Sequence, residues 1–355
     1  MNRIFTLMMV VIGVISTQAQ SIERQVIGSA GTTVNNGSVT MDFTIGDLAV
    51  TVITDGSTKI SQGFHQGSLL LAIKINPVAF IQGAALNPNN GEESLMRDDL
   101  RVADHIPTTS PYADALTVQN SVLTTTGANA IVDWIFVELR DAVTNTTIVA
   151  SQSALLQRDG DIVGVDGVSD LEFDLTAGDY YVALKHRNHL GIMTDATVAL
   201  SDIVTTLDFT DGSVNIYGTN AQTTFGMPSG VSAMWAGDAN GDGKVNLIGS
   251  SNDSNTIRDV ILNDPINLAI QFYGFNVTGY NDADTNLTGG TQIIGINNDA
   301  SLVRDNILNH PFNTFIQFYG FNITEQLPAE VNRKRIQSDI ALLEKVKALE
   351  AKSNK

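Results

Sequence analysis

The stretch Gly237-Asp-Ala-Asn-Gly-Asp-Gly-Lys-Val-Asn246 decides the fold of the C-terminal third of the chain. Oxygen-bearing side chains stand at alternate positions, Asp238, Asn240 and Asp242, and a glycine follows. Ca²⁺ takes about six to eight oxygen ligands, and alternate side chains converge on one ion when such a loop curls. Gly243 permits the sharp turn, and the backbone carbonyl of Lys244 offers a further ligand. The pattern predicts a calcium loop, with a plain Asp/Gly turn as the alternative.

A later carboxylate has to close this loop, and Asp253 is the candidate. It stands 15 residues after Asp238, later than the last ligand of a standard twelve-residue loop. An Asn-Asp pair at this point precedes a short apolar-periodic stretch, as an N-cap precedes a helix. Pro265 is expected to end that helix. The predicted unit is therefore a loop followed by a helix.

A second copy of the unit begins at Asn281-Asp-Ala-Asp-Thr-Asn286 and ends its helix before Pro311. Aligned on the first Asp, the copies are 44 residues apart at the start of the loop and 46 apart further on, which predicts two extra residues in the second loop. Leu287 then stands where the turn glycine belongs, so a decayed structural loop is the alternative to a second calcium site. The ligands expected in this copy are Asp282, Asp284, Asn286, the carbonyl of Thr288 and, closing the loop, Asp299.

Each copy ends in the same aromatic segment, Ile270-Gln-Phe-Tyr-Gly-Phe-Asn-Val-Thr278 and Ile316-Gln-Phe-Tyr-Gly-Phe-Asn-Ile-Thr324. Duplication at the same place in each unit favours packing of one loop–helix unit on the other. A face that stacks on sugar rings is the alternative interpretation. The tandem repeats are assigned to residues 234–327.

The chain before the repeats is patterned for strands. Ala130-Ile-Val-Asp-Trp-Ile-Phe-Val-Glu-Leu139 is the clearest strand, and several more short, alternating stretches follow it. Seven or more strands at this spacing predict an Ig-like β-sandwich over residues 71–212. Residues 20–70 are expected to form a small N-terminal β module, and residues 213–233, rich in Gly, Ser, Thr and Asn, a linker. Residues 328–355 are predicted to form a charged helix that could mediate oligomerisation or lie on the protein's own body.

Composition restricts the function classes. The chain of 355 residues has a net charge of −18 and no cysteine. Phosphate binding needs clustered Lys and Arg, so no nucleic-acid partner is expected. Residues 1–19 have the charged start, apolar run and small-residue end of a signal peptide, and no other segment reaches transmembrane length. We therefore expect a protein that is secreted or held at the outer cell surface.

The repeat resembles dockerin-type and EF-hand-like calcium loops in Gly237-Asp-Ala-Asn-Gly-Asp-Gly-Lys-Val-Asn246. The wider chain is similar to secreted surface proteins of Bacteroidota-type bacteria, often labelled hemagglutinin-like. The matching stretches include Leu95-Met-Arg-Asp-Asp-Leu100, Ala154-Leu-Leu-Gln-Arg-Asp-Gly-Asp161 and Tyr181-Val-Ala-Leu-Lys-His-Arg-Asn-His-Leu-Gly191. The resemblance covers residues ~72–327 and implies export, a β-sandwich and paired calcium loops, without an established activity.

The sequence contains no recognisable catalytic set. His186 and His189 could be a metal pair, but a polar cluster at the end of a strand is favoured. Gly241-Asp-Gly-Lys244 is not a phosphate-binding loop because Val245 follows the lysine. We therefore predict a non-enzymatic adhesion or interaction protein stabilised by Ca²⁺, with an unidentified protein or glycan partner at the cell surface. The alternatives are a dockerin that recruits a cohesin-like partner, and a carbohydrate-binding accessory protein of a polysaccharide-degrading system.

Overall fold

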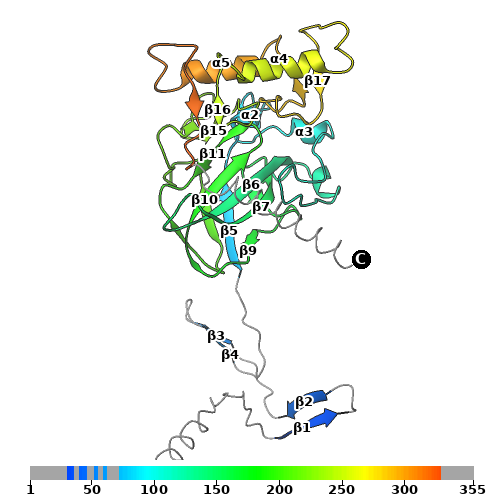
Figure 1. Ribbon diagram of the computed structural model, residues 1–355, viewed down its shortest axis with the longest axis vertical. Coiled ribbons are helices and arrows are strands. Elements are labelled where there is room, and N and C mark those ends of the chain that lie inside the picture. Colours follow the sequence, from blue (N-terminus) through cyan, green and yellow to red (C-terminus); the bar gives the residue numbers. More distant parts are fainter. Residues whose placement is uncertain (1–29, 36–39, 46–51, 55–58, 62–71, 329–355) are drawn as a thin grey trace, which may run out of the picture. The chain divides into compact units, whose positions relative to one another are not determined.

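A computed structural model of the chain describes residues 30–35, 40–45, 52–54, 59–61 and 72–328 (Figure 1). Contacts divide the chain into two compact units, Met1–Leu69 and Leu70–Lys355. The predicted signal peptide and the predicted C-terminal helix after Pro328 lie outside the described residues. No helix in the described ranges is long and apolar enough to cross a membrane.

The first unit contains two antiparallel hairpins. Strand β1 (Ala30–Asn35) pairs with β2 (Thr40–Ile45), and β3 (Val52–Thr54) pairs with β4 (Lys59–Ser61). The alternation of Met41, Phe43 and Ile45 with polar residues predicts β2, since side chains two apart face the same side of a strand. The β character predicted for this region is confirmed.

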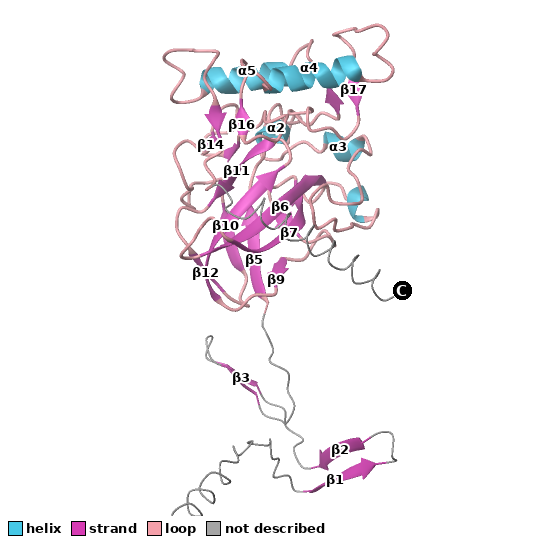
Figure 2. Ribbon diagram, in the orientation of Figure 1, coloured by secondary structure: helices cyan, strands magenta, loops and turns pink. Residues whose placement is uncertain are grey.

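The larger unit is built on a six-stranded antiparallel sheet in the order β11-β10-β6-β7-β8, with β12 also paired to β10 (Figure 2). The central strand β6 is the predicted one, and Trp134 and Ile135 within it are fully buried. Near-continuous apolar residues suit a strand that is covered on both faces. The strands are β6 (Ile131–Asp141), β7 (Ile148–Gln157), β8 (Ile162–Val163), β10 (Gly178–His186), β11 (His189–Met193) and β12 (Val198–Leu200).

A second sheet of three strands has the order β13-β5-β9. Strand β5 (Ile73–Val78) pairs in parallel with β13 (Thr205–Asp208) and antiparallel with β9 (Leu171–Phe173). Side chains of both sheets share one apolar core, and the chain is mainly β with several antiparallel sheets, as predicted. Short helical turns are α2 (Gln82–Ala85), α3 (Asp99–Val102) and the 3₁₀ turn η1 (Val122–Thr124).

The segment predicted as a linker is folded onto this body. It contains strand β14 (Gln222–Thr223), which pairs with β15 (Ala233–Met234), and Thr223 is 1% exposed. Its polar composition misled the prediction because backbone pairing, as between β14 and β15 and between Tyr217 and Met193, holds the segment on the body with few apolar side chains. The contacts accordingly place residues 72–328 in one compact unit.

Each repeat forms the predicted loop and helix. Helices α4 (Asp253–Asn263) and α5 (Asp299–Asn309) lie end to end along one edge of the unit (Figure 1). The side chains of Asn252 and Asn298 cap the two helices by accepting backbone N–H bonds, which confirms the predicted N-caps. The apolar faces of the helices share a second core with Trp235 and Leu190, so the repeats are packed on the sheet.

The two repeats exchange their final strands. Strand β16 (Lys244–Val245) in the first loop pairs with β19 (Ile323–Thr324) at the end of the second repeat. Strand β18 (Gly290–Thr291) in the second loop pairs with β17 (Val277–Thr278) at the end of the first. Each repeat therefore completes the other, and neither loop is independent of its partner.

Candidate metal-binding loops

The first loop is organised around the carboxylate of Asp238. Its two oxygens accept the backbone N–H groups of Asp242 at 3.0 Å and Gly243 at 2.9 Å. The amide oxygen of Asn240 accepts the Asp242 N–H at 2.9 Å, and Asp242 accepts the N–H of Lys244 at 3.0 Å. These bonds curl the loop, and Gly243 turns it with φ of 78°. The predicted turn is therefore present.

Asp253 closes this loop from the first residue of α4. It is fully buried, and its carboxylate accepts the N–H of Ala239 at 2.8 Å and that of Asn246 at 2.7 Å. Asp253 therefore lies against the start of the loop although it is late in the sequence. The helix supplies the carboxylate that a standard loop would place on its own last residue.

Burial in the first loop disfavours the ionised form of both Asp238 and Asp253. Burial raises the pKa of Asp238 to about 7, and the neighbouring Asp253 adds to the shift. Burial likewise raises the pKa of Asp253 to about 7. Within residues 72–328, no Lys, Arg or His forms an ion pair with either carboxylate. The loop therefore collects negative charge that its described neighbours do not neutralise.

The second loop has the same geometry at a constant offset of 46 residues. Asp284 takes the place of Asp238, since its two oxygens accept the N–H groups of Thr288 at 3.0 Å and Gly289 at 2.8 Å. Asp299 takes the place of Asp253, accepting the N–H of Asn286 at 3.2 Å. The two extra residues predicted for this loop are therefore absent, and the predicted alignment was wrong at its start.

The constant offset shifts the role of every predicted ligand in this loop except Asp299, and it moves Leu287 away from the turn position. Asp282 lies before the loop, with a side chain that is 63% exposed and 3.6 Å from Arg187. Thr288 takes the place of Asp242, and the carbonyl of Gly290 takes the place of the Lys244 carbonyl. Leu287 is not at the turn position, which Gly289 occupies with φ of 81°. The alignment failed because Asp282-Ala-Asp284 resembles Asp238-Ala-Asn240 of the first loop. This look-alike stretch begins two residues before the true start of the second loop.

Asp284 and Asp299 are both fully buried, and burial raises the pKa of each, that of Asp299 to about 7. The Arg187 guanidinium opposes this shift at Asp284. The second loop therefore has partial compensation that the first lacks, and it has one carboxylate fewer because Thr288 replaces Asp242.

The residues fit a hard cation better than a soft one. Their donors are carboxylate, amide and carbonyl oxygens, which suit Ca²⁺ and not thiolate- or imidazole-seeking metals. Among the described residues, no three His, Asp or Glu side chains are gathered as they are around a bound metal ion. Each loop instead offers two buried carboxylates with amide and carbonyl oxygens near them. Asp238, Asn240, Asp242 and the Lys244 carbonyl are the candidate ligands of the first loop, with Asp253.

Sequence reasoning missed two residues that organise the loops. Asn246 exchanges two bonds with Asp253, donating its N–H at 2.7 Å and accepting the Asp253 N–H at 3.1 Å. Asn188, in the turn between β10 and β11, accepts the N–H of Asp238 and donates its amide to the carbonyls of Asp282 and Asp284. Asn246 could have been found, since it is the ninth residue from Asp238, where calcium loops often have an oxygen ligand.

The histidine pair is a structural cluster, as predicted. His186 and His189 face each other across the β10–β11 turn with their Nδ1 atoms 3.0 Å apart. His186 contacts Asp133 at 3.2 Å, and Arg187 donates to the same carboxylate at 3.0 Å. Burial alone would raise the pKa of Asp133, but Arg187 and His186 lower it to about 2. The cluster joins the sheet to the second loop, since Arg187 also donates to the Asn281 carbonyl.

The aromatic segments are only partly buried. Phe275 and Phe321 pack against the second core, as predicted. Phe272 and Phe318 are 58% and 59% exposed, and Tyr273 and the second copy's tyrosine are each 48% exposed. The prediction that these rings pack one repeat on the other was wrong for the exposed ones, because the helices themselves fill the contact between the repeats.

No protein-family model matches this chain, and neither the curated proteins nor the solved structures searched contain a match. The resemblance to dockerin-like surface proteins therefore stays a prediction from the quoted motifs.

Proposed function

We propose that this protein is an exported, calcium-stabilised interaction protein without catalytic activity. The observation that carries the proposal is the burial of Asp238 and Asp253 together, without a described cation beside them. Burying unpaired carboxylates is costly, and such groups are normally paired or bound to a metal. A divalent cation held by these oxygens would remove that cost.

Calcium would act on the whole repeat pair. Each loop is tied to its helix by a carboxylate and to the other repeat by a two-residue strand pair. Because Ca²⁺ would bind the folded loops and not the unfolded chain, its binding energy adds to folding stability. The Ig-like arrangement that we propose for the two sheets would serve as the rigid support.

The surface that we propose for the partner is the pair of exposed aromatic rings in each repeat. Phe272 and Phe318, with the tyrosines that follow them, stand in segments without Lys, Arg or Glu on a chain of net charge −18. Aromatic side chains are enriched at recognition surfaces because they bury large areas at low entropic cost. An uncharged protein or glycan surface outside the cell fits this pattern best.

The dockerin alternative would use the helices themselves, over Thr256 to Leu262 and Leu302 to Leu308. Its support is weaker, because Ile257, Ile261 and Val303 face the second core.

The proposed function is tested by measuring how the double variant Phe272→Ala, Phe318→Ala adheres to cultured epithelial cells and to immobilised polysaccharides. We expect the melting temperature to be kept and adhesion to be lost. The control is Val143→Ala, an exposed apolar residue in the β6–β7 turn. Equal adhesion of the double variant and the wild type would refute the proposed surface.

A further inference from the structure

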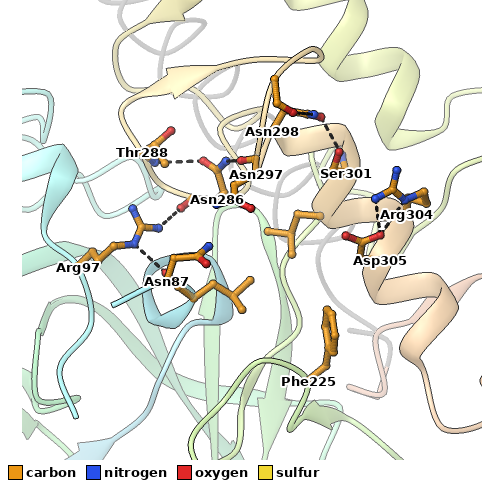
Figure 3. A pocket seen from close by; sticks show the side chains of 13 residues that line it. Asn87, Arg97, Phe225, Asn286, Thr288, Asn297, Asn298, Ser301, Arg304 and Asp305 are labelled. Carbon is orange, nitrogen blue, oxygen red and sulfur yellow. Dashed lines mark hydrogen bonds and ion pairs between the residues drawn. The ribbon is translucent and has the colours of Figure 1, made fainter. Parts of the chain in front are cut away.

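A cavity of about 500 Å³ lies between the second loop, helix α5 and the segments around Leu86 and Phe225 (Figure 3). Its volume is in the range of small-molecule sites, about 300–1,000 Å³. It is separate from the aromatic segments that we propose for the partner. None of the sequence motifs pointed to it, because its walls come from four distant parts of the chain.

The walls of the cavity are held in place by buried hydrogen bonds. Arg97 donates to the carbonyl of Leu86 at 2.8 Å and to that of Asn286 at 2.7 Å, so it joins opposite walls. The backbone carbonyl of Phe225 accepts from the Gln82 amide at 3.1 Å. Gly226 has a φ of 77°, which favours glycine, and a Cβ at this position would displace the end of the Leu86 side chain, so glycine suits the Phe225 turn beside this wall. The cavity is therefore formed before any ligand enters.

Several polar groups of the lining are free to bind a ligand. Within the described residues, the side chains of Asn87, Asn297 and Ser301 make no hydrogen bond, whereas the other polar groups hold the walls. Arg304 donates its Nε–H to one oxygen of Asp305 at 2.7 Å, and its Nη2 atom forms an ion pair with the same oxygen, which leaves the second carboxylate oxygen as an acceptor. Donors and acceptors therefore line both the α5 side and the Asn87 side of the cavity.

Charge and shape restrict the ligand class. Arg97 is paired with Asp99 and Arg304 with Asp305, so the lining holds no uncompensated cation for a phosphate or carboxylate. Leu302 and Phe225 line the cavity and add apolar surface beside the amides, and Figure 3 labels Phe225. A sugar ring has this same combination, since each hydroxyl both donates and accepts while the ring C–H face is apolar.

We propose that this cavity binds a neutral saccharide, with Asp305, Asn87 and Ser301 bonded to its hydroxyls and Phe225 against its ring face. The site would give the interaction protein a second, smaller recognition surface. It does not require the aromatic segments or the metal, because Arg97 holds the walls.

The test is saturation-transfer NMR on residues 20–355 with glucose, galactose, mannose, fucose, N-acetylglucosamine, lactose and cellobiose, followed by titration of each sugar that binds. Asp305→Asn is expected to weaken binding at least tenfold, as loss of a hydrogen bond to a charged group does, and Asn87→Ala about two- to tenfold, as loss of a neutral hydrogen bond does. Phe225→Ala should do the same, and its melting temperature shows whether the fold is kept.

The matched control is Asp259→Asn. Asp259 pairs with Arg258 in the first repeat, at the position equivalent to Asp305, but it does not line the cavity. Its affinity for sugar should equal that of the wild type. All samples are measured in CaCl₂ and again in EDTA, and binding in either buffer supports the site. Absence of binding by every sugar in both buffers overturns it, as does binding that Asp305→Asn and Asn87→Ala leave unchanged, or a preference for inorganic phosphate.

Discussion

Asp242→Asn should change the stability of the protein in opposite directions with and without calcium. Asp242 is exposed, and its carboxylate accepts the N–H of Lys244 at 3.0 Å, a bond that an asparagine oxygen can keep. Its charge helps to raise the pKa of both Asp238 and Asp253, so it repels the two buried carboxylates. Removing the charge should relieve the metal-free loop and weaken the calcium-loaded one.

The expected magnitudes follow from these two roles. In chelator the gain should be a few tenths to about 1 kcal/mol, the usual size of an interaction that involves an exposed charge. In calcium the loss of a charged ligand should weaken binding by at least the roughly 10- to 100-fold that outer-shell changes cost. That is about 1.4–2.8 kcal/mol, or a melting temperature lowered by about 3–11 °C for a domain of this size.

The assay is thermal unfolding in 5 mM CaCl₂ and in 5 mM EDTA, followed by circular dichroism. The control is Asp264→Asn, because Asp264 makes the same type of bond to the N–H of Ile266 at 2.9 Å outside the loops. The control should shift equally in both buffers. A shift of the same sign and size for Asp242→Asn in both buffers would refute the reasoning.

Three further predictions follow from the same geometry. The buried loop carboxylates have pKa values of about 7 in the folded protein against 3.8 when unfolded, so the folded state binds more protons between these values. Metal-free stability should therefore fall as the pH rises from about 4 to about 7, which urea unfolding at each pH would measure, and a flat profile would contradict the shifts. Asp284→Ala should remove one calcium site in a calorimetric titration, whereas Asp282→Ala should keep it; the reverse result would restore the alignment first expected. Arg187→Met should destabilise the protein by about 3–5 kcal/mol in urea unfolding, because it leaves Asp133 buried without its main partner, and the exposed control Lys74→Met should have little effect. A small effect of Arg187→Met would show that Asp133 is not held as a charge.

Local patterns predicted the elements of this protein well. The apolar run that contains Trp134 predicted the central strand, and the Asn-Asp pairs predicted the starts of both helices within a residue. These signals are local, since side-chain periodicity and capping depend on residues a few positions apart. The curled backbone of the first loop, with its turn at Gly243, was predicted for the same reason.

The remaining features depend on contacts between distant residues. The position of Asn188 between the two loops arises only when the β10–β11 turn meets the repeats. The exposure of Phe272 and Phe318 depends on which side chains fill the space between the helices. The role of Asp284 was missed although Gly289, five residues later, matches Gly243 after Asp238. If the two repeats had been aligned on Gly243 and Gly289 and not on the first Asp of each, the constant offset of 46 residues would have been found.

The central claim is tested most directly by calorimetric titration of CaCl₂ into residues 20–355 at pH 7.5. The account predicts two sites, with tighter binding at the first loop because it has one more carboxylate and no nearby arginine. It also predicts fewer bound ions at pH 5, where protons compete for the raised pKa values. Absence of binding at millimolar calcium would contradict the account and leave the loops as turns closed by protonated carboxylates.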